Sequence, residues 1–206
     1  QHWSSAASDV YKRQDIRRSL LNMKSIIEGE RALCFWLSQQ TEVSLYHPDE
    51  KIKQEALDYV SLMTPVVKSL FTDLAMEITN DAMQIHGGYG YTKDQGIEQL
   101  YRDNRITPIY EGTNSVQAAD LVFRKLSNKN GDVINKFLDM IKSEFDSKNE
   151  KVNAFSKELN HYLDILSKFT DWIKDKHKIE KDDVSAAAND YPVSYTHLRA
   201  HETVKN

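Results

Sequence analysis

The chain has 206 residues, of which 27 are Lys or Arg and 31 are Asp or Glu, so its formal net charge is −4. This charge argues against a protein that mainly binds nucleic acid, since such proteins usually carry a basic excess. The single cysteine, Cys34, excludes a disulfide framework and a cysteine-rich metal site, and no apolar run is long enough to span a membrane. With 40% apolar residues but only 7 Gly and 4 Pro, the composition predicts a globular protein built from long helices.

Both ends of the chain differ from its middle, because residues 1–14 and 191–206 show neither helical nor alternating apolar order. The strings SSAASDVYKRQ and PVSYTHLRAHET resemble translated adapter-like DNA, so we interpret both ends as assembly artefacts. Ordinary disordered tails are the alternative interpretation. The expected organisation is a tail over 1–14, a helical domain over 15–128, a partial helical extension over 129–183 and a second tail over 184–206.

Two long amphipathic helices are predicted in the first half of the chain. Apolar residues recur at helical spacing over 15–44 and again over 50–83, and Cys34 lies on the apolar face that is expected to enter the core. His47-Pro48-Asp49 interrupts the pattern, and Asp49 is a good candidate for the N-cap of the second helix. Gly87-Gly88-Tyr89-Gly90 ends that helix, because its three glycines supply positive φ angles and allow close backbone approach.

Shorter helices are predicted in the second half. One covers 96–105 and the next covers about 113–127, while Gly131 separates them from two further amphipathic helices. The charged run over 174–183 is expected to be a solvated, fraying end. Since no strand is convincing, the predicted fold is all-α: an antiparallel helical bundle with an appended C-terminal helical segment.

Three motifs in the middle of the chain point to a family. They are QIHGGYGY at 84–91, LYRDNRI at 100–106 and IYEGTNSVQ at 109–117. In this order and spacing they resemble the C-terminal helical domain of the acyl-CoA dehydrogenases. The resemblance covers roughly 15–127, since DIRRSLLNMKS and EGERAL look like the first helix of that domain. The helices after Gly131 resemble the subgroup with a C-terminal extension, which includes enzymes similar to 3-(methylthio)propanoyl-CoA dehydrogenase.

The resemblance implies a reaction in which an acyl-CoA thioester gains an α,β double bond while a flavin accepts the β-hydrogen as hydride. It implies that Glu111 removes the α-proton, a role that suits a carboxylate whose pKa an apolar pocket raises. The backbone N–H of Glu111 is expected to donate to the thioester oxygen, Gly112 to leave room beside the acyl chain, and Tyr110 to line the pocket. From the residues alone, a solvated loop glutamate is the alternative for Glu111.

The same resemblance implies FAD as the cofactor, with two groups of binding residues. Thr113 and Ser115 stand at the start of a predicted helix, where free N–H groups favour an anion such as the FAD diphosphate. Gln84, Gly87 and Gly88 match the segment that reaches the adenine-diphosphate half of FAD, which in this family is usually bound by the neighbouring subunit. Helix capping by Thr113 and a plain Gly-Gly turn are the alternatives for the two groups.

The resemblance further implies an acyl-CoA substrate, an electron-transfer flavoprotein as electron acceptor, and a homodimer or homotetramer. The scattered residues His47, His86, His161 and His177 show no paired ligand spacing, so no metal site is expected.

The helical pattern starts abruptly at Asp15, so we expect the chain to be a fragment of a larger enzyme that turns over no substrate on its own. A non-enzymatic helical interaction or oligomerisation module is the alternative, and a family member repurposed for another acyl substrate or for DNA-damage response is a third hypothesis. The expected location is the bacterial cytoplasm. The mitochondrial matrix stays open, because the natural N-terminus is expected to be missing.

Overall fold

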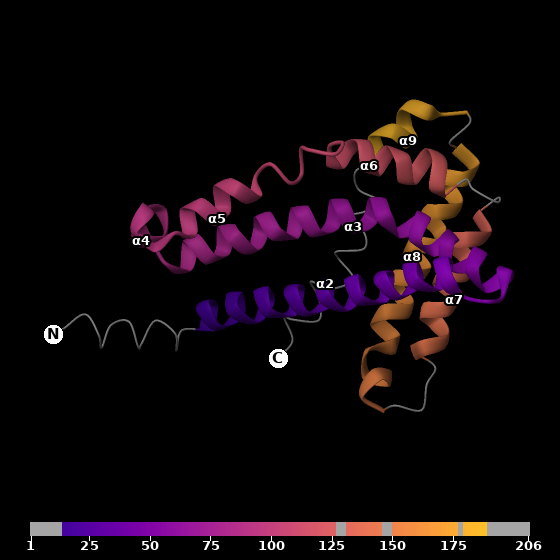
Figure 1. The fold of residues 1–206 in the computed structure, drawn as a ribbon, viewed down its shortest axis with the longest axis horizontal. Helices are drawn as coiled ribbons and strands as arrows, with labels where there is room; N and C mark the ends of the chain where they lie inside the picture. The colour runs from indigo at the N-terminus through magenta and orange to yellow at the C-terminus, as the bar shows by residue number, and fades with distance from the viewer. Residues whose placement is uncertain (1–13, 127–130, 146–149, 177–178, 189–206) are drawn as a thin grey trace.

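The computed structural model describes residues 14–126, 131–145, 150–176 and 179–188, and all regular structure in these ranges is helical (Figure 1). The α-helices in the described ranges are α2 (Gln14–Tyr46), α3 (Glu50–Ile85), α4 (Gly88–Tyr91), α5 (Ile97–Asn104), α6 (Asn114–Asp120), α7 (Asp132–Phe145), α8 (Glu150–Lys176) and α9 (Lys181–Ala188). The predicted all-α bundle is therefore confirmed. Of these described helices, none combines the length and the apolar content that crossing a membrane requires.

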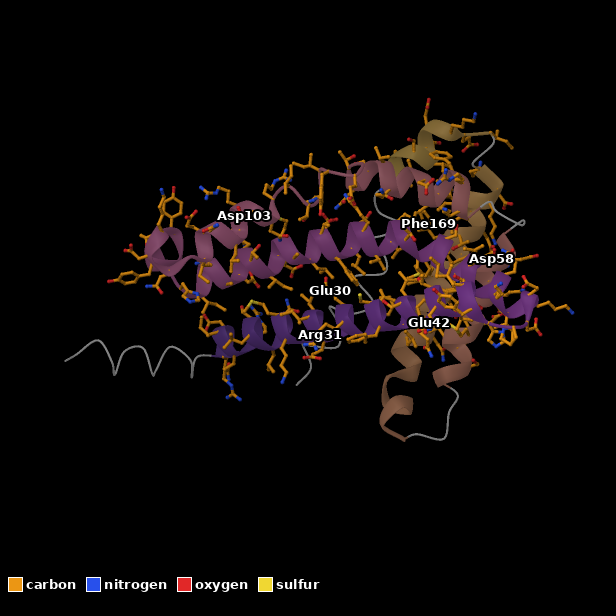
Figure 2. The ribbon with its side chains drawn as sticks, viewed as in Figure 1. Glu30, Arg31, Glu42, Asp58, Asp103 and Phe169 are labelled. Atoms are coloured by element: carbon orange, nitrogen blue, oxygen red, sulfur yellow. The ribbon has the colours of Figure 1, made fainter. Side chains whose placement is uncertain are left out.

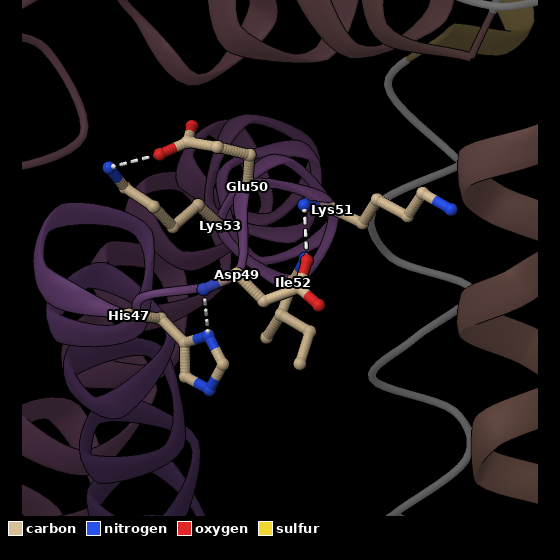
Figure 3. Close-up of polar contacts among 6 residues, drawn as sticks. All are labelled: His47, Asp49, Glu50, Lys51, Ile52 and Lys53. Carbon is tan, nitrogen blue, oxygen red and sulfur yellow. Dashed lines mark hydrogen bonds and ion pairs between the residues drawn. The ribbon is translucent and has the colours of Figure 1, made fainter.

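The first two helices form an antiparallel hairpin whose turn depends on Asp49 (Figure 3). The Asp49 carboxylate accepts hydrogen bonds from two backbone N–H groups in the first turn of α3, the shorter from Lys51 at 2.7 Å. The backbone N–H of Asp49 donates to Nδ1 of His47 at 3.1 Å, and Lys53 pairs with Glu50 at 3.2 Å. The predicted N-cap is thus confirmed, and it satisfies donors that the start of a helix leaves without partners.

The three glycines after α3 have different structural roles. Only Gly87 has a positive φ, of 60°, whereas Gly88 and Gly90 lie inside the short helix α4. The prediction that all three supply positive φ angles is therefore wrong for two of them. A Cβ on Gly90 would lie 2.5 Å from the carbonyl oxygen of Met83, so glycine allows α4 to pack against the end of α3. A Cβ on Gly88 would meet no described atom within 4 Å.

Helix α3 is the central element of the bundle (Figure 1). Helix α2 packs along one side of α3, and α5 and α6 pack along the opposite side. Figure 2 shows this arrangement through Arg31 on α2 and Asp103 on α5, which lie on either side of α3. Helix α9 packs against α6 on the side away from α3. Helix α6 is therefore held between a core helix and the last described helix.

One hydrophobic core joins the bundle to the C-terminal helices. Apolar residues of α3 pack there against residues of α7, α8 and α9, so the core crosses the predicted domain boundary at 128. Directly after α6, the π-helical turn Leu121–Lys125 widens the helix, and the N–H of Leu126 donates to the oxygen of Leu121 at 2.9 Å. As a result Leu121, Val122 and Leu126 are all fully buried. Sequence periodicity predicts a helix here but not its wider turn.

Three aromatic rings connect α2, α3 and α7. The ring centroids are 6.0 Å apart for Trp36 and Tyr59, 5.9 Å for Trp36 and Phe137, and 6.1 Å for Tyr59 and Phe137. All three pairs are tilted, which is a favourable geometry for aromatic rings. Burial raises the pKa of Tyr59 to about 12, and the Glu55 carboxylate adds to the rise by accepting a hydrogen bond from the Tyr59 hydroxyl at 3.1 Å.

Where the structure describes it, the charged run over 174–183 has no buried residue, as its composition predicts, but the prediction that it is a fraying end is wrong. Helix α8 continues into the run, and α9 begins before the run ends. Val184 and Ala188 of α9 are 0% and 3% exposed, so apolar residues beyond the run fix α9 to the core. The boundary predicted at 184 falls inside α9, while residues 1–13 and 189–206 lie outside the described part of the chain.

The prediction that Cys34 belongs to the core is also wrong, because its side chain is exposed. Helix α2 packs through a narrow face on which Leu33, Trp36 and Leu37 reach the core. Cys34 follows Leu33 by one position, which rotates its side chain about 100° around the helix and away from that face.

Phe137→Ala is expected to lower the free energy of unfolding of the chain by about 3–5 kcal/mol, because it removes a buried ring that contacts two other helices. The matched control is Phe35→Ala on α2. The Phe35 side chain is 69% exposed, so its loss should change the free energy by less than about 0.5 kcal/mol. Urea denaturation followed by circular dichroism measures both variants. Equal effects would show that the aromatic junction of Trp36, Tyr59 and Phe137 does not hold α7 to the bundle.

Candidate functional site

The loop between α5 and α6 contains most of the residues that the third motif singles out. Its backbone folds back on itself, because the N–H of Tyr110 donates to the oxygen of Ile106 at 3.0 Å. The N–H of Asn114 donates to the oxygen of Pro108 at 3.1 Å and closes the loop at its other end. Pro108 cannot donate a backbone hydrogen bond of its own, which suits a segment where the helix has stopped.

Glu111 adopts an uncommon backbone conformation in this loop. Its φ is 55°, and it is the only non-glycine residue with a positive φ among the described residues. Gly112 follows with a φ of 83°, so two successive residues lie in the left-handed region. This conformation costs a residue with a Cβ roughly 1–2 kcal/mol. The side-chain amide of Gln117 donates to the backbone oxygen of Glu111 at 3.0 Å and helps to hold it there.

The Glu111 side chain is exposed, and apolar side chains beside it are exposed as well. Ile109, Tyr110 and Val116 show 46%, 49% and 57% of their surface to solvent. The backbone N–H of Glu111 donates no hydrogen bond to any residue within the described ranges. The loop thus presents a carboxylate, a free backbone donor and apolar surface together.

Thr113 and Ser115 begin the helix that follows the loop. The Thr113 hydroxyl accepts a hydrogen bond from the backbone N–H of Val116 at 3.4 Å, so Thr113 is the N-cap of α6. This is the capping role that the sequence left open as an alternative. The Ser115 side chain is exposed and forms no hydrogen bond with the described part of the chain.

Asn114 is a structural residue of the site that the sequence analysis missed. Its side chain forms hydrogen bonds with Lys68, Ser69, Thr72 and Asp73, all on α3. These four residues lie at i and i+4 spacing on one side of α3, where the neighbouring turns are apolar. A polar stripe interrupting the apolar face of a long helix is the signal that could have revealed the contact.

Gln84, Gly87 and Gly88 lie elsewhere, at the end of α3 and the start of α4. Gln84 is eleven positions beyond Asp73 on α3, which places the two about 16 Å apart along the helix axis. The structure therefore does not bring the two predicted groups of cofactor-binding residues together within one chain. The Gln84 side chain is exposed and makes no hydrogen bond in the described ranges, and a Cβ on Gly87 or Gly88 would meet open space.

Metal-binding side chains do not gather in the described ranges. No group of three or more His, Cys, Asp or Glu residues there could hold a metal ion.

Comparison with known proteins identifies relatives of this chain. A family model described as the C-terminal domain of acyl-CoA dehydrogenases matches residues 5–126. The chain is 38% identical over 135 residues to 3-methylmercaptopropionyl-CoA dehydrogenase of Ruegeria pomeroyi, covering 66% of this chain and 23% of that protein. It is 32% identical over 149 residues to a butyryl-CoA dehydrogenase of Syntrophomonas wolfei, covering 72% of this chain and 24% of that protein.

A solved structure shares the fold. ACDH-11 of Caenorhabditis elegans, solved in complex with C11-CoA, matches 94% of this chain with a TM-score of 0.72 and 22% identity. The match covers 33% of the ACDH-11 chain, and the chain spans about a quarter of the length of the two bacterial relatives.

Glu111→Gly is expected to raise the free energy of unfolding of the 206-residue chain by about 0.5–1 kcal/mol, because glycine adopts a positive φ without a steric penalty. Part of this gain is lost to the larger backbone entropy of glycine in the unfolded chain. Glu111→Gln is the control, since glutamine keeps the Cβ and should leave the free energy unchanged. Urea denaturation distinguishes them, and two variants of wild-type stability would show that the loop carries no strain at this position.

Proposed function

Because the chain belongs to the acyl-CoA dehydrogenase family, we propose that it is the C-terminal helical part of an FAD-dependent enzyme that introduces an α,β double bond into an acyl-CoA thioester. One observation carries the proposal. Glu111, the glutamate of the third motif, is held in a left-handed conformation that no other described residue except glycine adopts. Strain of this kind persists where the surrounding structure imposes it, and it is common at active sites.

In this proposal, Glu111 is the base that removes the α-proton of the substrate. A carboxylate becomes an effective base when an apolar pocket raises its pKa. The exposed residues Ile109, Tyr110 and Val116 would form part of that pocket once other parts of the enzyme cover them. The free backbone N–H of Glu111 would donate to the thioester oxygen, where negative charge develops as the proton leaves. Gly112 adds no side chain beside the acyl group.

The residues proposed to hold FAD fit a polar, phosphate-containing ligand. Ser115 and Gln84 have polar side chains without partners in the described ranges, and Thr113 presents a hydroxyl at the start of α6. The backbone at Gly87 and Gly88 is open, so a phosphate could approach it closely. Bound FAD would supply the redox chemistry by accepting the β-hydrogen as hydride.

The distance between the two sets of proposed FAD-binding residues supports binding of each FAD by two subunits together. Thr113 and Ser115 lie beside Glu111, whereas Gln84, Gly87 and Gly88 lie at the far end of α3. We therefore propose that the second group binds the FAD of a neighbouring subunit in a homodimer or homotetramer. An electron-transfer flavoprotein is the proposed electron acceptor, and the two bacterial relatives favour the bacterial cytoplasm as the location.

Glu111→Gln in the complete enzyme is expected to lower kcat at least about a hundredfold, because the amide cannot accept the α-proton. The flavin content should stay at the wild-type level, since glutamine has the same shape. The reduction of an electron acceptor by an acyl-CoA substrate measures turnover, and flavin absorbance measures cofactor content. Glu42→Gln on the exposed side of α2 is the matched control and should keep wild-type turnover. The 206-residue chain alone should show no turnover. Near-normal turnover in Glu111→Gln would contradict the assignment, whereas a colourless complete protein would favour a non-enzymatic helical module.

Gly88→Ala in the complete enzyme is expected to reduce flavin retention without lowering the stability of the 206-residue chain. A Cβ at Gly88 meets open space in this chain, so only a ligand, a neighbouring subunit or another part of the complete enzyme would sense it. Gly90→Ala is the contrasting variant, because its Cβ would clash with the backbone of α3 and destabilise the chain itself. Flavin absorbance after gel filtration measures flavin retention, and urea denaturation measures the stability of the chain. Full flavin retention in Gly88→Ala would remove Gly88 from the proposed site.

A further inference from the structure

The side chain of Asn114 links the first turn of α6 to α3. Its Oδ1 accepts a hydrogen bond from Nζ of Lys68 at 2.7 Å. Its Nδ2 donates to Oδ1 of Asp73 at 2.7 Å, to Oγ1 of Thr72 at 3.0 Å and to the backbone oxygen of Ser69 at 3.3 Å. The amide is therefore surrounded by partners from a single face of α3.

The charges on α3 explain why an amide occupies position 114. The cation of Lys68 needs an acceptor and the carboxylate of Asp73 needs a donor, and an asparagine side chain offers one of each. An aspartate at 114 would repel Asp73, and an aliphatic residue would leave both charges without this bridge. The same charges fix the orientation of the amide, because the reverse orientation would place its NH2 group against Lys68.

Asn114 and Lys68 both act on the pKa of the Asp73 carboxylate. Burial raises the pKa of Asp73, while the hydrogen bond from Asn114 and the positive charge of Lys68 oppose that rise. A change to the side chain of Asn114, Lys68 or Asp73 is therefore expected to affect the other two as well.

The link through Asn114 fixes the loop that carries Glu111. The backbone N–H of Asn114 closes the loop on Pro108, and Glu111 lies three positions before Asn114. The left-handed conformation of Glu111 costs free energy, so the loop needs attachments outside itself to keep it. The side chain of Asn114 is such an attachment, since it ties the end of the loop to α3.

We propose that Asn114, Lys68 and Asp73 form a positioning network that holds Glu111 where it can take the α-proton. This inference rests on the proposed role of Glu111 as the base. None of the three residues touches the reacting atoms in this proposal. They act through the backbone, and a base displaced by about 1 Å can lose roughly a hundredfold in rate.

The test in the complete enzyme uses Asn114→Asp, Asp73→Asn and the double variant that exchanges the two side chains. Asn114→Asp should lower kcat about a hundredfold while KM and flavin content stay within about twofold, because a small displacement slows proton transfer far more than it weakens binding. The exchanged pair again places one amide against one carboxylate, so kcat should return to within a few-fold of wild type. Asn80→Asp is the matched control, since Asn80 is an exposed residue of α3 and should leave kcat unchanged.

A wild-type kcat in Asn114→Asp would overturn the proposal, as would loss of flavin together with kcat or failure of the exchanged pair to restore kcat.

Hydrogen exchange in the 206-residue chain gives a second readout that needs no activity. The backbone N–H of residue 114 should exchange at least about tenfold faster in Asn114→Asp and return to its slow rate in the exchanged pair. Unchanged exchange would also overturn the proposal. If Glu111→Gln keeps its activity, the assignment of the base fails. If that variant is inactive while Asn114→Asp is normal, only the positioning network fails.

Discussion

The side-chain amide of Asn114, held between two charged residues, attaches the loop that carries Glu111 to the rest of the bundle. Asn114 reaches from the first turn of α6 to Lys68 and Asp73 on α3, and α9 packs on the other side of α6. Helix α6 is short, so its own hydrogen bonds cannot define where it starts in space. The position of the loop before it therefore depends on these contacts with α3 and α9, so α9 helps to place the loop without containing any of the candidate residues.

The loop also shows how stability and function can oppose each other. A glycine at position 111 would relieve the left-handed conformation, but it would remove the carboxylate on which the proposed chemistry depends. The rest of the fold compensates for this cost through ordinary packing. The large core shared by α3, α7, α8 and α9, with the aromatic junction of Trp36, Tyr59 and Phe137, keeps the bundle folded around a loop that is strained at one residue.

The sequence predicts the features that depend on local pattern. Helical periodicity located α2 and α3, Asp49 marked the cap between them, and the third motif singled out Glu111. Features that depend on contacts between distant segments were missed. Asn114 resembles any candidate for a helix cap until its partners 41–46 positions earlier are known. Val184 directly follows the charged run over 174–183, and only the core that receives it explains why a helix forms there.

The position of the Glu111 carboxylate relative to bound substrate decides whether Glu111 can be the base. The measurement is a crystal structure of the complete enzyme with FAD and a non-reactive acyl-CoA analogue. If Glu111 is the base, one of its carboxylate oxygens lies about 3–3.5 Å from the α-carbon, with Asn114 still bonded to Lys68 and Asp73. A structure in which the Glu111 carboxylate faces solvent, away from the acyl chain, would contradict that role.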